Sequence, residues 1–271
     1  MVTRRLAIRS IGAAALTAAM ACAGSGPTHG QRADVVYVPT PIETVERMLR
    51  LADVRSNDFV IDLGSGDGRI PIAAARRGAR ALGIEIDPDR IREAEASARS
   101  TSVADRVGFR QEDLFKTPLT EATVITLYLL PELNVRLSPR LLALRPGTRI
   151  VSHLFAMGDW KPDASDADGG MIYLWIVPPQ ITGRWQVHHG AGSFTVEFAQ
   201  RYQELSGTAR FAGSTAAIRD GRLRGASIEF TVDVEGKPAR FRGIVDGNRM
   251  QAAPAGFVSG AQTVPWSATR M

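Results

Sequence analysis

The sequence predicts an α/β protein in two parts, a doubly wound parallel sheet followed by a small antiparallel β domain, either a barrel or a sandwich. Strands and helices alternate over the first part, which is typical of a parallel sheet covered on both faces. A glycine-rich turn at Gly64–Gly68 follows the first strand. After Asp168 the pattern changes to short alternating runs between glycine turns. We therefore divide the chain into residues 1–33, 34–170 and 171–271.

The composition is that of an ordinary globular protein, and it excludes several functional classes. Of the 271 residues, 44% are hydrophobic and 23% are charged. The formal net charge of +5 is dispersed, without a dense basic block, so we expect no specific nucleic-acid partner. The single cysteine, Cys22, excludes an internal disulfide, and His188-His189 has no obvious third ligand, so we expect no metal site.

The first 33 residues contain no acid and have the layout of an export signal. Arg4-Arg5 is similar to a twin-arginine signal, and the apolar run of residues 11–21 is too short to span a bilayer. Cys22 stands where bacterial lipoproteins carry an acylated cysteine, although Ala19 replaces the usual leucine. We expect an exported protein, periplasmic or tethered to the membrane through Cys22. A mitochondrial presequence or a cytoplasmic helix is the alternative.

Hydrophobic periodicity and the positions of capping residues, prolines and glycines assign the elements of the first domain. Thr40-Pro41 and Asp87-Pro88 each place a capping residue before a proline at the first helical position. Gly78 and Pro146-Gly147 end helices. The expected helices are 41–52, 71–77, 88–98 and two short pieces, the second of which begins at Ser138. The expected strands are 59–63, 81–86, 107–111, 122–129 and 148–154.

The second domain is expected to consist of strands alone and to pack against the first domain without holding its ligand. Asp220-Gly221 and Asp246-Gly247 are typical hairpin turns. Trp185 and Trp266 are expected in its core. The expected strands are 183–187, 194–199, 208–211, 227–234, 240–245 and 249–252.

Three acids stand at the ends of three successive strands of the first domain. Asp62 ends the first strand, Glu85 ends the second, and Asp113 follows the third. Because open α/β sheets bind ligands outside the carboxyl ends of their strands, we expect these carboxylates to converge on one crevice. A single strand-end acid is often only solvated or a helix cap, as we expect of Asp67 and Asp87. The joint placement is what indicates a site.

The glycine loop narrows the choice of ligand. Its backbone amides can approach a ligand closely. A dinucleotide fingerprint has glycine at its first, third and sixth positions, whereas the sixth position here is Arg69. Asp62 would place negative charge beside a pyrophosphate, but it suits the cationic methionine half of S-adenosylmethionine. We therefore predict this cofactor, with Glu85 on the ribose hydroxyls and Asp113 on the adenine amino group. The predicted cofactor-binding residues are Asp62, Gly64, Ser65, Gly66, Glu85, Asp113 and Leu114.

These features resemble the class I S-adenosylmethionine-dependent methyltransferases, which have a Rossmann-like sheet. More narrowly, they are similar to the family that contains the mitochondrial lysine methyltransferase of the ATP synthase c subunit. The resemblance covers about half of the chain and accounts for neither the N-terminal segment nor the β-rich tail. The matching stretches are Val38–Pro41, Asp62–Ile70, Gly83–Glu85, Asp113–Phe115 and Phe155–Pro162.

The resemblance implies an enzyme that transfers the sulfonium methyl group to a nucleophile, with a protein lysine amine as the expected acceptor. Tyr128 is then the candidate catalytic residue, because related enzymes line the acceptor channel after the fourth strand. The sequence lacks the Asn-Pro-Pro-Tyr type of tetrapeptide, which argues against amide and adenine acceptors. Glu132 and His153 are candidate proton acceptors, although structural roles fit them better. The expected channel residues are Thr40, Leu130, Pro131, Asn134 and Trp160.

A second function remains open at this stage. S-adenosylmethionine is made in the cytoplasm, so an exported enzyme would lack its cofactor supply. The alternative is an exported, lipoprotein-like binding module whose methyltransferase fold no longer catalyses transfer. The three acids favour retained cofactor binding, but they do not establish turnover.

Overall fold

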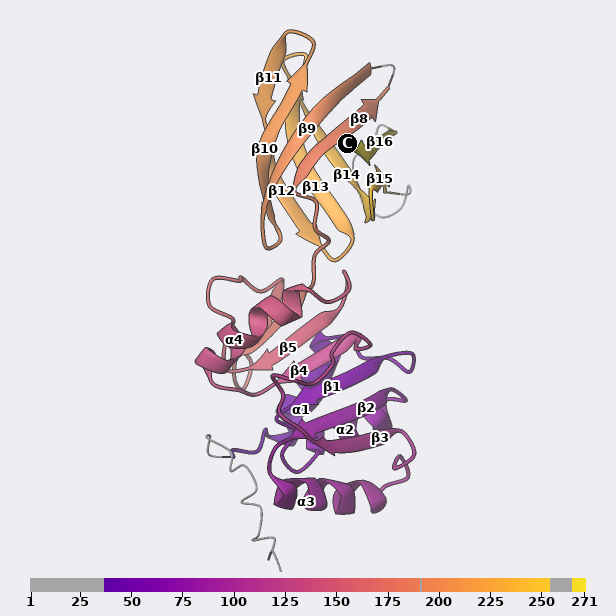
Figure 1. Cartoon of the computed structure of the whole chain (residues 1–271), viewed down its shortest axis with the longest axis vertical. Helices are drawn as coiled ribbons and strands as arrows, with labels where there is room; N and C mark the ends of the chain where they lie inside the picture. Colours follow the sequence, from indigo (N-terminus) through magenta and orange to yellow (C-terminus); the bar gives the residue numbers. More distant parts are fainter. Residues whose placement is uncertain (1–36, 191, 254–264) are drawn as a thin grey trace, which may run out of the picture. The chain divides into compact units, whose positions relative to one another are not determined.

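The computed structural model describes residues 37–190, 192–253 and 265–271 (Figure 1). Arg4-Arg5 and Cys22 lie outside the described residues, so the export signal and the lipid anchor stay predictions. Within the part that is described, no helix combines the length and the apolar character that crossing a membrane requires.

The first half of the described chain forms the predicted doubly wound sheet. Its strand order is β3-β2-β1-β4-β5-β7-β6, and the first five of these run parallel. The order reverses between β1 and β4, which makes this the point where such a fold opens a crevice. The strands are β1 (Phe59–Leu63), β2 (Arg80–Glu85), β3 (Val107–Gln111), β4 (Val124–Leu127), β5 (Arg149–His153), β6 (Ala164–Asp166) and β7 (Ile172–Ile176).

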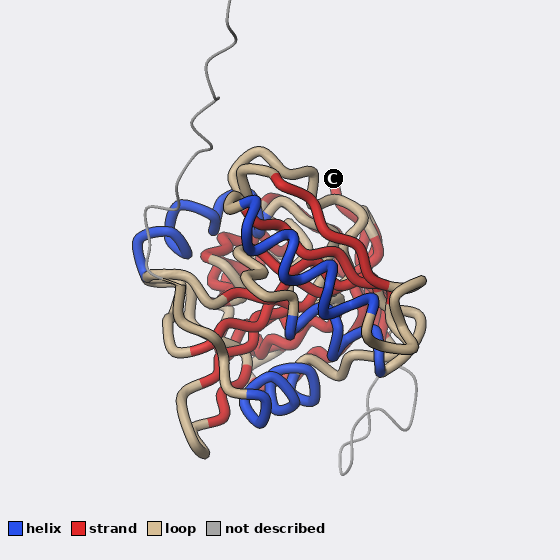
Figure 2. Tube along the Cα trace, turned by 90° about the horizontal axis from the view of Figure 1, so that it is seen from below, coloured by secondary structure: helices blue, strands red, loops and turns tan. Residues whose placement is uncertain are grey.

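Helices cover both faces of this sheet (Figure 2). Neighbouring strand residues point to opposite faces, so Val60 packs with α1 and α2 while Ile61 packs in the cluster that contains α4. Burial on both faces explains the near-continuous apolar strands. The helices are α1 (Ile42–Leu51), α2 (Arg69–Arg76), α3 (Pro88–Arg99) and α4 (Pro131–Leu142).

Two local expectations were wrong. A single helix, α4, replaces the two short pieces, and Pro139 lies inside it. Proline leaves the carbonyl four residues earlier without its usual donor, and the Ser138 hydroxyl donates to that carbonyl, Val135 O, at 2.9 Å. Thr40 does not cap α1, since the helix begins after Pro41 without a side-chain cap bond.

The boundary between the domains also moves. β7 pairs antiparallel with β5, from Arg149↔Ile176 to His153↔Ile172, so it belongs to the first sheet. The predicted boundary at 170/171 therefore shifts to the segment between Ile176 and Gly183. Strand periodicity identifies a strand but does not say which sheet receives it.

The second sheet of the described chain closes into an antiparallel barrel of eight strands. β10 pairs with both β9 and β12, which closes the ring β8-β9-β10-β12-β13-β14-β15-β16, while β11 pairs only at its rim with β10. The strands are β8 (Gly183–His189), β9 (Gly192–Arg201), β10 (Glu204–Phe211), β11 (Ser214–Ala217), β12 (Arg219–Arg224), β13 (Ser227–Val234), β14 (Lys237–Asp246), β15 (Arg249–Ala252) and β16 (Trp266–Arg270).

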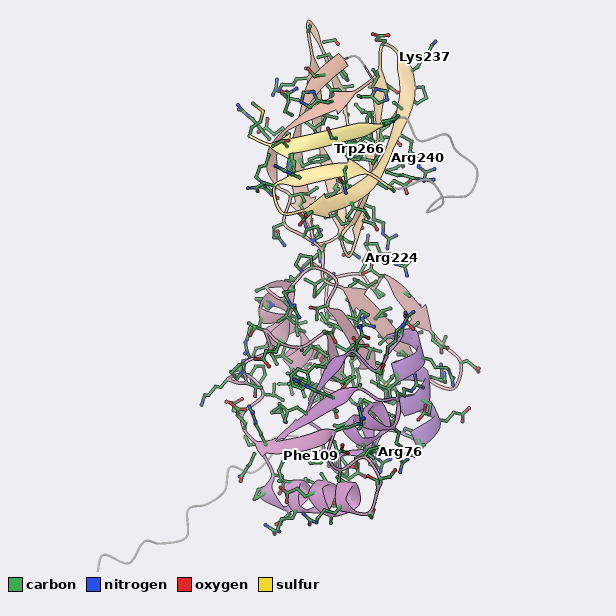
Figure 3. All side chains as sticks on the ribbon, turned by 90° about the vertical axis from the view of Figure 1, so that its right-hand side faces the viewer. Arg76, Phe109, Arg224, Lys237, Arg240 and Trp266 are labelled. Atoms are coloured by element: carbon green, nitrogen blue, oxygen red, sulfur yellow. The ribbon has the colours of Figure 1, made fainter. Side chains whose placement is uncertain are left out.

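Aromatic side chains fill the barrel. The rings of Phe230 and Phe241 stack with centroids 4.9 Å apart, and Trp266 meets both edge-on. Figure 3 labels Trp266 in this domain. The predicted core positions Trp185 and Trp266 are both buried. A packed interior means that this domain contacts its surroundings through its surface and its turns.

One turn of the barrel contacts the segment that follows β5. The ring of Tyr202, between β9 and β10, stacks on Trp160 at a centroid distance of 5.9 Å. The amide of Gln203 donates to Lys161 O at 2.7 Å. Asp159 and Lys161 add ion pairs to the same turn.

Candidate active site

A pocket of about 340 Å³ lies at the carboxyl ends of the parallel strands. All three strand-end acids line it, as do the loops that follow β1, β2, β3 and β4. Of the predicted cofactor residues, six line the pocket: Asp62, Gly64, Ser65, Glu85, Asp113 and Leu114. Gly66 lies behind this lining.

Asp62 is the most unusual group in the pocket, because only 2% of it is exposed. Its Oδ1 accepts a hydrogen bond of 2.5 Å from the Thr126 hydroxyl, while its Oδ2 has no donor among the described residues. Burial raises the pKa of this carboxyl, the Thr126 hydrogen bond opposes the rise and the charges of Glu85 and Asp67 add to it, so that the pKa reaches about 7. A buried oxygen without a partner is unfavourable, so the site fits a ligand that brings a cation.

The loop between Asp62 and α2 is held tightly. The amides of Gly64 and Ser65 both donate to Ile84 O at 2.9 Å. Gly64 has φ of 81°, and a Cβ there would lie 3.0 Å from Leu129. Only glycine adopts this backbone without strain and lets a ligand approach it.

Glu85 anchors the same loop. Its Oε2 accepts from Gly66 N at 2.9 Å, and its Oε1 accepts from the amides of Ile86 and Asp87 at 2.7 and 3.0 Å. A carboxylate has about four acceptor positions. One therefore remains for a ligand hydroxyl, which is fewer than a carboxylate devoted to the ribose alone would offer.

The residues that follow β3 include two apolar side chains that could pack against a flat ring. Leu114 and Phe115 line the pocket, and the Arg136 guanidinium lies 3.8 Å from the Phe115 ring centroid. The Oδ1 of Asp113 accepts from Phe115 N at 2.9 Å, which fixes the loop.

Two of the predicted acceptor-side residues, Tyr128 and Thr40, also line the pocket. The Tyr128 ring lies 4.3 Å from the His153 ring and 6.3 Å from the Phe155 ring, measured between centroids. Burial lowers the pKa of His153, so its imidazole is neutral near pH 7. His153 packs against Tyr128 but does not line the pocket.

The other predicted channel residues lie outside this pocket. Asn134 is fully buried on the sheet side of α4, where its amide donates to Phe155 O at 3.1 Å. Trp160 is buried beneath Tyr202 and accepts a hydrogen bond from Trp175 at its carbonyl. Leu130, which is 41% exposed, and Pro131 lie at the start of α4.

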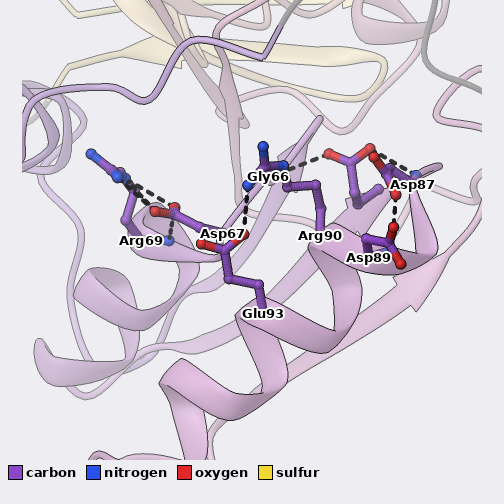
Figure 4. Close-up of polar contacts among 8 residues, drawn as sticks. Gly66, Asp67, Arg69, Asp87, Asp89, Arg90 and Glu93 are labelled. Carbon is purple, nitrogen blue, oxygen red and sulfur yellow. Dashed lines mark hydrogen bonds and ion pairs between the residues drawn. The ribbon is translucent and has the colours of Figure 1, made fainter.

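Sequence reasoning missed four residues at the rim. The Arg69 guanidinium donates two hydrogen bonds side by side to the Asp67 carboxylate, and the shorter contact is 2.6 Å (Figure 4). Tyr37 and Arg90 also line the pocket. The sequence predicts only a capping role for Asp67, and it gives no sign of Tyr37, which the path of the preceding chain brings to the pocket. By contrast, Asp87 caps α3 as expected, accepting from Asp89 N at 2.8 Å.

Comparison with known proteins identifies the fold and the family. The family model of the ANTKMT methyltransferase domain matches residues 62–164, which contain all three acids. A protein-lysine N-methyltransferase of Saccharolobus islandicus is 43% identical over 151 residues, covering 53% of this chain and 94% of that relative. The chain belongs to this family of S-adenosylmethionine-dependent methyltransferases.

Two further relatives agree with the assignment of family and cofactor. The lysine N-methyltransferase of the ATP synthase c subunit from Mus musculus is 31% identical over 134 residues, covering 49% of this chain and 54% of that protein. A crystal structure of an RNA methyltransferase from Salinibacter ruber in complex with S-adenosyl-L-homocysteine is 55% identical, with a TM-score of 0.52. It covers 53% of this methyltransferase and 96% of that chain. The predicted family, enzyme class and cofactor are therefore confirmed.

The residues of the pocket fit this cofactor. Asp62 Oδ2 and Ser65 Oγ are buried polar atoms without partners among the described residues, and the cofactor carries an ammonium, a carboxylate and two ribose hydroxyls. Family membership supports an enzyme, and it gives no support to the alternative of an exported binding module. Export itself stays a prediction.

Proposed function

We propose that this methyltransferase transfers a methyl group from S-adenosylmethionine to a lysine side chain of another protein. The observation that carries the proposal is the 43% identity to a protein-lysine N-methyltransferase across 94% of that relative. The mouse relative, also named a lysine methyltransferase, supports the same acceptor chemistry.

The pocket supports one orientation of the cofactor. The ammonium of its methionine half pairs with Asp62, and its ribose lies at Glu85. Its adenine packs against Leu114 and Phe115. This orientation turns the sulfonium towards the end of β4, where Tyr128 lines the pocket. When bound, the cofactor supplies an activated methyl group, which an in-line nucleophile displaces from sulfur.

Tyr128 is the residue best placed to act on the acceptor. A lysine must be neutral to attack, and the half-buried Tyr128 side chain lines the pocket at the end of β4, where it can orient the amine. The neutral His153 ring adds no positive charge beside it. The protein contribution is then to align and desolvate the amine, which accounts for much of the acceleration in such displacements. Tyr128 stays a candidate catalytic residue on this account.

An RNA acceptor is the second candidate, because the Salinibacter ruber protein with 55% identity is named an RNA methyltransferase. We propose the lysine, and the two acceptors give different products. The purified full chain is incubated with S-adenosylmethionine labelled in its methyl group, together with either the proteins or the RNA of a bacterial extract. Each fraction is then hydrolysed to amino acids or nucleosides.

We expect the label in Nε-methyllysine of the protein fraction and none above the enzyme-free control in nucleosides. Label that appears only in methylated nucleosides contradicts the proposal and selects the RNA acceptor. Label in neither fraction, from a protein that binds the cofactor, contradicts both.

A further inference from the structure

The chain segment just before α1 covers part of the cofactor loop. We call residues 37–40 the strap. Tyr37, Val38 and Thr40 of the strap line the pocket. Arg69 Nη1 donates to Thr40 O at 2.7 Å, so the strap is tied to the first residue of α2.

The ring of Tyr37 is fixed from two sides. A Cβ on Gly66 would lie only 2.1 Å from Tyr37 Cε2, which means that the ring rests directly on the loop backbone. On the ring, the Arg90 guanidinium lies 4.2 Å from the centroid, a cation–π distance. Arg90 in turn pairs with Glu93 at 2.6 Å (Figure 4). The glycine and the arginine thus leave the ring little freedom.

The hydroxyl of Tyr37 is buried, and no hydrogen bond of ordinary geometry joins it to another described residue, although the Asp67 carboxylate lies beside it. Burial and the nearby charge of Asp67 raise the pKa of Tyr37 above its ordinary value, so the phenol keeps its proton. Ser65, 5% exposed on the same loop, also has an unpartnered hydroxyl. Two buried donors therefore lie by the loop.

These donors face a pocket whose charged groups leave one part of the cofactor unmatched. Asp62 matches the ammonium, but the pocket acids repel the carboxylate of the methionine half. Three arginines also line the pocket, and each has another partner: Arg69 pairs with Asp67, Arg90 pairs with Glu93, and Arg136 lies over the Phe115 ring. A neutral hydroxyl can donate to a carboxylate without adding charge.

We propose that Tyr37 is a cofactor-binding residue whose hydroxyl donates a hydrogen bond to the carboxylate of the methionine half. Gly66 and Arg90 act as positioning residues for its ring. Because the carboxylate is present in both substrate and product, Tyr37 holds both forms of the cofactor. Tyr37 contacts the cofactor alone, so its role is the same for a lysine or an RNA acceptor.

Calorimetric titration of the full chain tests the proposal with three probes. S-adenosylmethionine and S-adenosylhomocysteine carry the carboxylate, whereas 5′-methylthioadenosine keeps adenine, ribose and sulfur but lacks the amino-acid part. Tyr37→Phe removes only the hydroxyl and preserves the ring. We expect it to weaken the first two by about tenfold, the scale for a hydrogen bond to a charged group. Binding of 5′-methylthioadenosine should stay within about twofold.

The matched control is Tyr173→Phe, which removes a hydroxyl from β7, outside the pocket lining. It should change none of the three affinities. An equal loss for all three probes in Tyr37→Phe would assign Tyr37 to support of the loop and overturn the carboxylate contact. Unchanged affinity for S-adenosylmethionine overturns it as well.

Discussion

Asp62→Asn is expected to weaken binding of S-adenosylmethionine by about 10- to 100-fold near pH 8. The substitution keeps an oxygen for the Thr126 hydroxyl but removes the charge that would pair with the cofactor ammonium. Hydrogen bonds to charged groups contribute about 1.5–3 kcal/mol, and each 1.4 kcal/mol is about tenfold. Calorimetric titration measures the change directly, and unaltered affinity in a folded variant would remove Asp62 from the site.

The same carboxyl should make cofactor binding depend on pH. The pKa of Asp62 is raised to about 7, and only its ionised form pairs with the ammonium. At about pH 6 roughly a tenth of the molecules carry the charge, against most of them at about pH 8. The affinity of the unmodified protein should therefore fall by about tenfold between these values. Asp62→Asn should show a much flatter profile.

The stability of the cofactor-free protein should depend on pH in the opposite direction: it should fall as the pH rises. The folded protein binds the Asp62 proton more tightly than the unfolded chain, in which the carboxyl has its ordinary pKa of 3.8. The folded state therefore loses stability as the pH rises from about 4 to about 7, by about 4 kcal/mol at most. Asp62→Asn should stabilise the free protein above pH 7 and not near pH 4, as measured by urea unfolding. A variant less stable at both values contradicts this.

Removing the barrel should preserve cofactor binding but reduce methyl transfer. Among the residues that the structure describes, none that lines the pocket lies beyond Arg136, and Val177 completes the core of the first sheet. A chain ending after Pro178 should therefore bind S-adenosylmethionine within about threefold of the full chain. The Salinibacter ruber relative supports the cut, because its match covers 96% of that chain but only 53% of this one.

Methylation of protein lysines by the truncated chain should fall by about tenfold or more. The barrel turn holds Trp160 and Lys161, and the same segment begins at Phe155, whose ring stacks near Tyr128. A misplacement of about 1 Å can cost about a hundredfold in rate. In the full chain, Tyr202→Ala should reproduce part of the loss.

A barrel variant away from this turn provides the control. Arg184 on β8 is exposed and makes only a 3.9 Å ion pair with Glu197, so Arg184→Ala should leave methylation unchanged. Full methylation by both the truncated chain and Tyr202→Ala would show that the barrel has no part in the reaction. Loss of cofactor binding on truncation would mean that the boundary is still misplaced.

Much of the site could be predicted from the residues at the ends of the strands alone. Asp62, Glu85 and Asp113 could be placed together because parallel strands bring their carboxyl ends to one edge of a sheet. The fold class followed from the alternation of elements. The sheet that receives β7 was placed wrongly, because the change to short strands and glycine turns after Asp168 outweighed its continuous apolar run, Ile172–Ile176, which is typical of a strand buried on both faces.

Side-chain direction was the harder problem. Asn134 was assigned to the acceptor channel from its place near the end of β4, yet it shares a buried helix face with Leu137 and Leu141. That spacing of three and four residues was visible in the sequence and indicates the sheet side. No pattern in the sequence indicates where Tyr37 lies. Its position depends on how the strap crosses Gly66 and on Arg90, which belongs to α3.

The most direct test of the cofactor assignment is a crystal structure of the full chain with S-adenosylhomocysteine. We expect Asp62 Oδ2 within about 3 Å of the cofactor amine, the usual length for a charged hydrogen bond. Glu85 should contact a ribose hydroxyl, and the sulfur should face Tyr128. The reverse orientation, with adenine at Asp62 and the amino acid at Asp113, would contradict the account.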